Sequence, residues 1–181
     1  IRSIAILGAG SMGAQIAAHL ANAGLAVLLL DINTQTATAG LRRATKLKPG
    51  PFFDQKCRNR IRIGGFDQDL ATLTEYDWIV EAVVEQLSTK QALIEQVEVH
   101  RRADTIVSSN TSGIPISTIA QGRSEEFRSH WLGSHFFNPP RYLRLVELVP
   151  TNDTNPQVVE TLSSFIDHRL GKGVVLAKDT P

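Results

Sequence analysis

Short, continuous apolar runs recur along the chain. Their aliphatic and β-branched residues predict strands that are buried in a sheet. We expect these strands at residues 3–10, 25–31, 77–83, 104–110, 131–137, 144–149 and 172–178.

The segments between these runs carry apolar residues at helical spacing. In residues 11–24, Met12, Ile16 and Leu20 fall on one stripe and Gly24 ends the helix. Further helices are expected at residues 33–46, behind a capping box of Ser88 and Gln91, at 115–121, and from Asn155 to Gly171. Residues 47–65 are expected to be irregular and basic. The alternation predicts an α/β fold: a Rossmann-type, doubly wound, mostly parallel sheet with helices on both faces.

Composition narrows the class of protein. A chain of 181 residues with 42% hydrophobic and 20% charged residues predicts one globular domain. The net charge of +1 is too small to attract nucleic acid or an anionic membrane electrostatically, and we expect neither as a partner. Cys57 is the single cysteine, read as a solvated loop thiol, so we expect no disulfide, no metal site and a reducing, cytoplasmic setting. The missing initiator Met and the final "LAKDTP" predict a piece of a longer protein.

A glycine-rich loop lies between the first predicted strand and helix. Gly8, Gly10 and Gly13 complete the G-x-G-x-x-G pattern, which suits a tight turn, close approach of a pyrophosphate and close helix packing. Asp31 ends the next strand, 18 residues after Gly13, where a carboxylate accepts from adenine-ribose hydroxyls and repels a 2′-phosphate. The loop therefore predicts NAD rather than NADP. The alternative is a structural turn with a helix-capping Asp. Arg42 and Arg43 are read as solvated.

Polar residues gather where other predicted strands end. Glu85, Asn110, Ser112 and His135 follow or end three of them. Each alone could be a turn former, but ligands of such sheets bind at the carboxyl ends of the strands.

His135 and Glu147 stand out in the stretch "HFFNPPRYLRLVELV". Strand alternation puts Glu147 on one face with Leu143, Leu145 and Val149, and Val146 and Leu148 on the other, so we expect a buried carboxylate that needs a partner. His135 is the candidate. A carboxylate that holds one imidazole nitrogen leaves the other as a base near neutral pH, which alcohol oxidation requires. His19, His100, His130 and His168 are read as surface or helix-packing residues.

With these motifs, the chain resembles the NAD-binding domain of the L-3-hydroxyacyl-CoA dehydrogenases of fatty-acid β-oxidation. The resemblance rests on "GAGSMG", "DWIVEAVVEQLSTK", "SSNTS", "GSHFFNPP", "LVELVP" and "KDTP", and it extends over residues 1–181. The wording "NPPRYLRLVELVP" is most similar to bacterial multifunctional versions.

The resemblance implies specific roles. His135 would be the general base and Glu147 its orienting acid, while Ser112 and Asn138 would bind the reacting oxygen of a 3-hydroxyacyl-CoA. The implied NAD contacts are Gly8, Ala9, Gly10, Ser11, Met12, Gly13, Asp31, Glu85, Lys90, Asn110, Ser112 and Asn138.

Two departures and two rival interpretations accompany the resemblance. The segment after the second strand is short, so CoA contacts are not carried over. The family's C-terminal helical domain, which covers the acyl site and makes the homodimer, is absent from this chain.

One rival interpretation is a lysine-dependent dehydrogenase of the 6-phosphogluconate or 3-hydroxyisobutyrate kind. The other is an NAD-binding module or crystallin-like structural protein without turnover.

Overall fold

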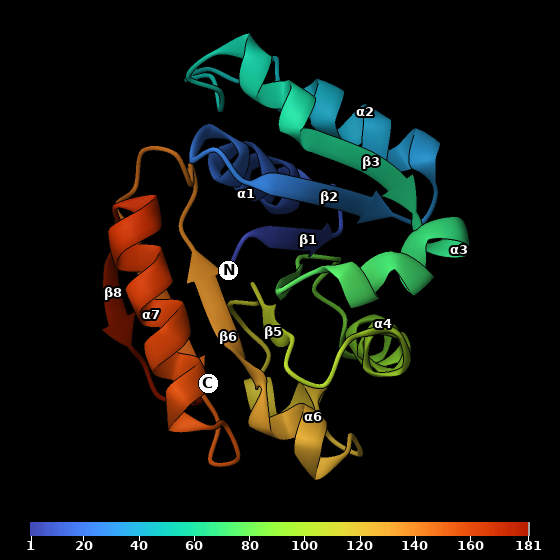
Figure 1. Cartoon of the computed structure of the whole chain (residues 1–181), viewed down its shortest axis with the longest axis vertical. Helices are drawn as coiled ribbons and strands as arrows, with labels where there is room; N and C mark the ends of the chain where they lie inside the picture. Colours follow the sequence, from blue (N-terminus) through green and yellow to red (C-terminus); the bar gives the residue numbers. More distant parts are fainter. Residues whose placement is uncertain (181) are drawn as a thin grey trace.

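The computed structural model describes residues 1–180 and contains one eight-stranded sheet in the order β3-β2-β1-β4-β5-β6-β7-β8 (Figure 1). Its strands are β1 (Ser3–Leu7), β2 (Ala26–Asp31), β3 (Ile61–Gly65), β4 (Trp78–Glu81), β5 (Ile106–Ser109), β6 (Trp131–Phe136), β7 (Leu145–Pro150) and β8 (Gly173–Leu176). All neighbours pair in parallel except β6 and β7, which are antiparallel. The predicted Rossmann-type, mostly parallel sheet is confirmed. The last residue of the "KDTP" motif, Pro181, lies outside the described residues.

Helices cover both faces of the sheet, as predicted. They are α1 (Ser11–Asn22), α2 (Thr34–Ala44), α3 (Phe66–Asp69), α4 (Leu87–His100), α5 (Ile116–Ile119), α6 (Glu125–Ser129) and α7 (Pro156–Leu170), with 3-10 turns η1 (Gln55–Arg60) and η2 (Leu70–Glu75). One apolar cluster packs α1, α2 and α7 on one face, through residues such as Ile16, Leu41 and Leu162. The other packs α4, α5 and α6 through Leu93, Ile119 and Phe127. Figure 1 shows α7 on one side of β6 and α4 and α6 on the opposite side.

The helix ends follow the predicted local signals in two cases. Gly24, just beyond α1, has a φ of 84°, and Gly171, just beyond α7, has a φ of 65°. The Asn155 side chain accepts a hydrogen bond from the Gln157 backbone N–H and so begins α7. These left-handed glycines and the polar cap end and begin the helices at small energetic cost.

Three local predictions were wrong. Residues 61–65 form β3, an edge strand that pairs with β2 through its backbone, although Arg62 is exposed and two glycines end the strand. The capping box is also wrong: α4 begins after Gln86, so Ser88 lies inside the first turn. Cys57 is not a solvated loop thiol, since it lies in η1 and packs partly buried against the core.

Within residues 1–180, none of the helices has the length and apolar character required to cross a membrane.

Candidate cofactor and catalytic site

The strand order reverses between β1 and β4. From β1 the chain continues to β2 and β3 on one side, and then returns to β4, β5 and β6 on the other. The loops after β1 and β4 therefore diverge, and this opens a crevice at the carboxyl ends of the strands, where open α/β sheets bind ligands.

The glycine loop forms one wall of this crevice, and two of its glycines are sterically required. Gly8 has a φ of 108°, and a Cβ there would lie 2.5 Å from the Ala82 carbonyl oxygen. A Cβ on Gly13 would lie 1.9 Å from the Gly8 carbonyl oxygen. Gly10 differs, because nothing in the described structure lies within 4 Å of where its Cβ would stand. The open space at Gly10 fits the close approach of a pyrophosphate to the N-terminus of α1.

Asp31 lies at the far end of β2 and supports the loop directly. Its Oδ2 accepts from the Ala9 N–H at 2.7 Å and its Oδ1 accepts from the Ile32 N–H at 2.7 Å. A carboxylate has about four lone-pair sites, so both oxygens keep acceptor capacity. Asp31 lines a cavity of about 410 Å³ whose walls are mostly apolar and include Ile32, Phe66 and Leu70. This set fits an adenosine: an acceptor for ribose hydroxyls beside an apolar slot.

A second cavity, of about 470 Å³, adjoins the first and shares its wall at Gly10, Ala82, Val83 and Val84. It brings together most of the residues expected to contact NAD and substrate: Ser11, Met12, Glu85, Lys90, Asn110, Ser112, His135 and Asn138. Together the two cavities can hold an elongated ligand across the strand ends. The residues present thus fit a dinucleotide such as NAD.

Glu85 clamps the loop after β5. Its Oε1 accepts from the backbone N–H groups of Ser112, at 3.1 Å, and Gly113, at 3.0 Å, and from the Thr111 hydroxyl. Partial burial raises the pKa of Glu85, but these hydrogen bonds and the Lys90 ammonium outweigh it and hold the pKa below its ordinary value. Glu85 therefore remains a carboxylate at neutral pH.

Lys90 lies beneath this loop and is only 1% exposed. Its ammonium donates to Glu81 at 2.8 Å and lies 3.2 Å from Glu85. Glu81 is fully buried at the end of β4, where it also accepts from the Val83 N–H and the Ser109 hydroxyl. The Lys90 charge thus holds Glu81 and Glu85 in place, and Lys90 also lines the second cavity, where its contact with NAD stays a prediction.

His135 and Glu147 meet as predicted. His135 Nδ1 lies 3.1 Å from Glu147 Oε2, and the two residues are register partners across β6 and β7. The expected burial of Glu147 is wrong: its side chain is 34% exposed, and Leu145 on the same face is exposed. The pair borders a cavity of about 210 Å³, which leaves the Glu147 carboxylate partly exposed.

The two asparagines differ in their function in the fold. Asn110 Oδ1 accepts from the Phe136 N–H at 2.9 Å, which ties the end of β5 to β6. Asn138 lines the cavity, and its Oδ1 accepts from Gln15 Nε2 at 3.2 Å.

Of the histidines other than His135, His19 is buried in α1. His168 is exposed, and His100 and His130 lie partly exposed at the surface, in agreement with their interpretation as packing and surface residues.

Sequence reasoning missed three residues that shape the site. Glu81 and Gln15 are described above. Asp179 accepts from the N–H groups of Ile116, at 2.6 Å, and Ser117, at 2.9 Å, and so fixes the chain end beside the loop that carries Ser112. A carboxylate inside the apolar "WIVEA" was a signal for Glu81, but the other two had none that distinguished them from surface residues.

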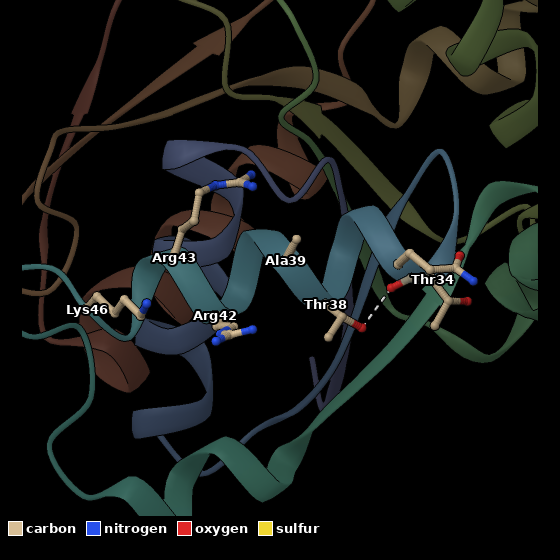
Figure 2. A pocket seen from close by; sticks show the side chains of 7 residues that line it. Thr34, Thr38, Ala39, Arg42, Arg43 and Lys46 are labelled. Atoms are coloured by element: carbon tan, nitrogen blue, oxygen red, sulfur yellow. Dashed lines mark hydrogen bonds between the residues drawn. The ribbon is translucent and has the colours of Figure 1, made fainter.

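A larger hollow, of about 510 Å³, lies along the outer face of α2 (Figure 2). It is lined by α2 and by Lys46 just beyond it. Arg42, Arg43 and Lys46 are exposed, and the Thr38 hydroxyl donates to the Thr34 carbonyl. Its lining contains none of the residues expected to contact NAD or substrate, so we do not assign the chemistry to it. No group of three or more His, Cys, Asp or Glu side chains in residues 1–180 is arranged to hold a metal ion.

Comparison with known proteins agrees with this geometry. The sequence model of the family described as "3-hydroxyacyl-CoA dehydrogenase, NAD binding domain" matches residues 3–180. A relative from Deinococcus radiodurans, named "Probable 3-hydroxyacyl-CoA dehydrogenase", is 48% identical over all of this chain and 54% of its own length. The "Fatty acid oxidation complex subunit alpha" of Pseudomonas syringae is 34% identical over all of this chain and 25% of its own length.

A solved structure, the 3-hydroxybutyryl-CoA dehydrogenase of Escherichia coli K12, superposes with a TM-score of 0.84 at 31% identity. The match covers 100% of this chain and 39% of that one. The chain therefore spans about half, or less, of the length of the proteins that it matches.

Proposed function

Since the chain belongs to the 3-hydroxyacyl-CoA dehydrogenase family as its NAD-binding domain, we propose that the complete enzyme oxidises (S)-3-hydroxyacyl-CoA to 3-ketoacyl-CoA with NAD in fatty-acid β-oxidation. The observation that carries the proposal is the His135–Glu147 pair, because His135 lines the cavity that leads to the glycine loop. A base beside a dinucleotide site is what alcohol oxidation requires.

His135 and Glu147 have different roles in the proposed reaction. Glu147 accepts at His135 Nδ1, so that nitrogen carries the proton and Nε2 is left as the base that takes the 3-hydroxyl proton. The carboxylate then stabilises the imidazolium that forms and keeps the ring in place. NAD, when bound, supplies the acceptor for the hydride that leaves the carbinol carbon.

The remaining site residues bind and orient. We assign Ser112 and Asn138 to the reacting oxygen, because both line the cavity beside His135. The glycine loop, from Gly8 to Gly13 with Ala9, Ser11 and Met12, binds the pyrophosphate, and Asp31 the adenine ribose. Glu85 contacts the nicotinamide-ribose side, Lys90 supports it from below, and Asn110 holds β5 against β6.

The rest of the protein is part of the proposal. The greater length of the relatives supports a further part of the protein. The proposal is that this part is a helical domain, which covers the acyl site and makes a homodimer, in a cytoplasmic protein of the multifunctional kind. The rival lysine-dependent dehydrogenases are not favoured, because the chain matches another family and carries a histidine–carboxylate pair that can serve as the base. The other rival, a binding module without turnover, is distinguished from the enzyme by the following assay.

The test is NADH formation from 3-hydroxybutyryl-CoA and longer 3-hydroxyacyl-CoA substrates, measured by absorbance with the full-length protein and with residues 1–181. We expect turnover by the full-length protein, its loss in His135→Ala, and NAD binding with little turnover by the shorter chain. His168→Ala, on the exposed end of α7, is the matched control. NAD binding without NADH formation from any chain length by the full-length protein would establish the module instead.

A further inference from the structure

Gln15 connects the glycine-loop helix to the substrate side of the cavity. It lies on α1, is 4% exposed, and its Nε2 donates to the Ser11 carbonyl oxygen at 2.8 Å. The same nitrogen donates to Asn138 Oδ1 at 3.2 Å, across 123 residues of chain. One amide group therefore joins the first turn of α1 to the loop after β6.

This pair of contacts determines which way both amides point. The Ser11 carbonyl can only accept, so the Gln15 atom that faces it is the NH2 group. That NH2 group also faces Asn138, so the Asn138 atom in contact with it is the accepting oxygen. The Asn138 NH2 group is then directed away from Gln15. The assignment follows from the Ser11 carbonyl and does not depend on telling oxygen from nitrogen in either amide.

The orientation matters because the reacting oxygen develops negative charge as its proton leaves. His135 accepts that proton, so the second partner of the oxygen has to be a donor for the charge to be stabilised. Asn138 and His135 line the same cavity, and the amide orientation supplies N–H on Asn138. In the flipped orientation, the Asn138 oxygen would repel the developing charge.

We propose that Gln15 is a positioning residue that holds the Asn138 amide with its N–H groups available to the reacting oxygen. The proposal rests on the proposed function, since it requires Asn138 to bind that oxygen. It adds a residue on the cofactor-binding helix that sets the hydrogen-bonding polarity of the substrate site.

Two nearly isosteric substitutions in the full-length enzyme test it. Glu in Gln15→Glu can only accept when ionised, so the Asn138 NH2 group turns toward it and its oxygen faces the substrate. Losing one preorganised donor costs on the order of 100-fold in kcat. Gln15→Met makes neither contact and leaves the amide free to take either orientation. With half of the molecules competent, kcat falls about twofold.

Two measurements distinguish a positioning role of Gln15 from a structural role and from a direct effect of the charge that Gln15→Glu introduces. The Kd for NAD, measured by calorimetry, should stay within about twofold of wild type in Gln15→Met, while the Kd for the product acetoacetyl-CoA rises with the loss of kcat. In an Asn138→Ala background, Gln15→Glu should have no further effect on kcat, because its effect passes through Asn138. A full effect of Gln15→Glu in that background would overturn the proposal, as would unchanged kcat in Gln15→Glu.

Failure of the two proposals is distinguishable. Absence of wild-type turnover, or turnover that survives His135→Ala, overturns the proposed function and this inference with it. Normal wild-type turnover that depends on His135 and Asn138 but is insensitive to Gln15→Glu overturns the role of Gln15 alone. If Gln15→Glu does not fold, the Met variant decides: a loss of kcat as large as that of Asn138→Ala, with weakened NAD binding, would indicate a structural role.

Discussion

His135 and Glu147 lie directly opposite each other in the antiparallel pair of β6 and β7, with Nδ1 and Oε2 3.1 Å apart. The strand register therefore sets their separation. A slip of one residue would turn Glu147 toward the face where Val146 and Leu148 are buried, at a high cost in desolvation. The single antiparallel step in this sheet brings a carboxylate to the histidine, and the buried neighbours of Glu147 hold it there.

His135→Ala in the full-length enzyme should lower kcat by ~10²–10⁴-fold, the usual contribution of a general base. The Kd for NAD should change little, because the ring lies at the Asn138 end of the cavity and away from Asp31. Since Glu147 acts through His135, the double variant His135→Ala/Glu147→Gln should be scarcely slower than His135→Ala. Steady-state kinetics of the four proteins measure this. Fully additive losses would indicate two independent roles.

Asp31→Ala should narrow the preference for NAD over NADP, because it removes both an acceptor for ribose hydroxyls and a charge that repels a 2′-phosphate. Calorimetric titration of both cofactors measures the ratio. Asp167→Ala, which removes an exposed carboxylate from α7, is the control and should leave the ratio unchanged. Tighter binding of NADP than of NAD to the unmodified protein would contradict the assignment of Asp31. Because Asp31 also accepts from the Ala9 N–H, some loss of NAD affinity is expected through the loop itself.

Lys90→Met should destabilise the fold by about 3–5 kcal/mol, as expected when one partner of a buried ion pair is removed. Glu81 is fully buried and would lose the ammonium from which it accepts a hydrogen bond at 2.8 Å. Chemical denaturation measures the free energy of unfolding. Lys178→Met, which removes an exposed ammonium after β8, is the control and should have little effect. Adding Glu81→Leu to Lys90→Met should recover only part of the loss, because the Val83 N–H and the Ser109 hydroxyl then lose their acceptor. Unchanged stability in Lys90→Met itself would contradict the prediction.

The parts of the fold that the sequence predicted are those with short-range causes. Apolar runs gave the buried strands, Gly24 and Gly171 gave two helix ends, and Gly8 and Gly13 are glycines for the steric reasons expected. The pairing of His135 with Glu147 was also predictable, because few other groups within reach could satisfy a carboxylate in that strand.

The parts that could not be predicted depend on contacts between distant segments. β3 forms because β2 offers its backbone, and its own sequence has glycines and an exposed Arg62 that resemble a loop. The burial of Lys90 is set by Glu81, and that of Gln15 by the packing of α1 against the sheet. The exposure of Glu147 depends on which helices cover β7, which strand alternation does not determine.

His19 should make the protein less stable in acid. Its side chain is 7% exposed, and neither ring nitrogen has a hydrogen-bond partner within residues 1–180. Burial, reinforced by the positive charges of Lys172 and Arg141, lowers the pKa of His19 from 6.5 to about 4. The unfolded chain therefore binds a proton between these two pH values that the folded chain does not, and stability falls as the pH drops from 6.5 towards 4.

The loss from this group is about 2 kcal/mol between neutral pH and about pH 5. It should disappear in His19→Leu, which keeps an apolar side chain in the core and cannot titrate. His168→Leu, at an exposed site on α7, should keep the wild-type dependence. Urea denaturation of the three proteins across this pH range measures the difference. Carboxylates that titrate in the same range act equally in all three, so a parallel pH dependence of wild type and His19→Leu would show that folding does not lower the pKa of His19.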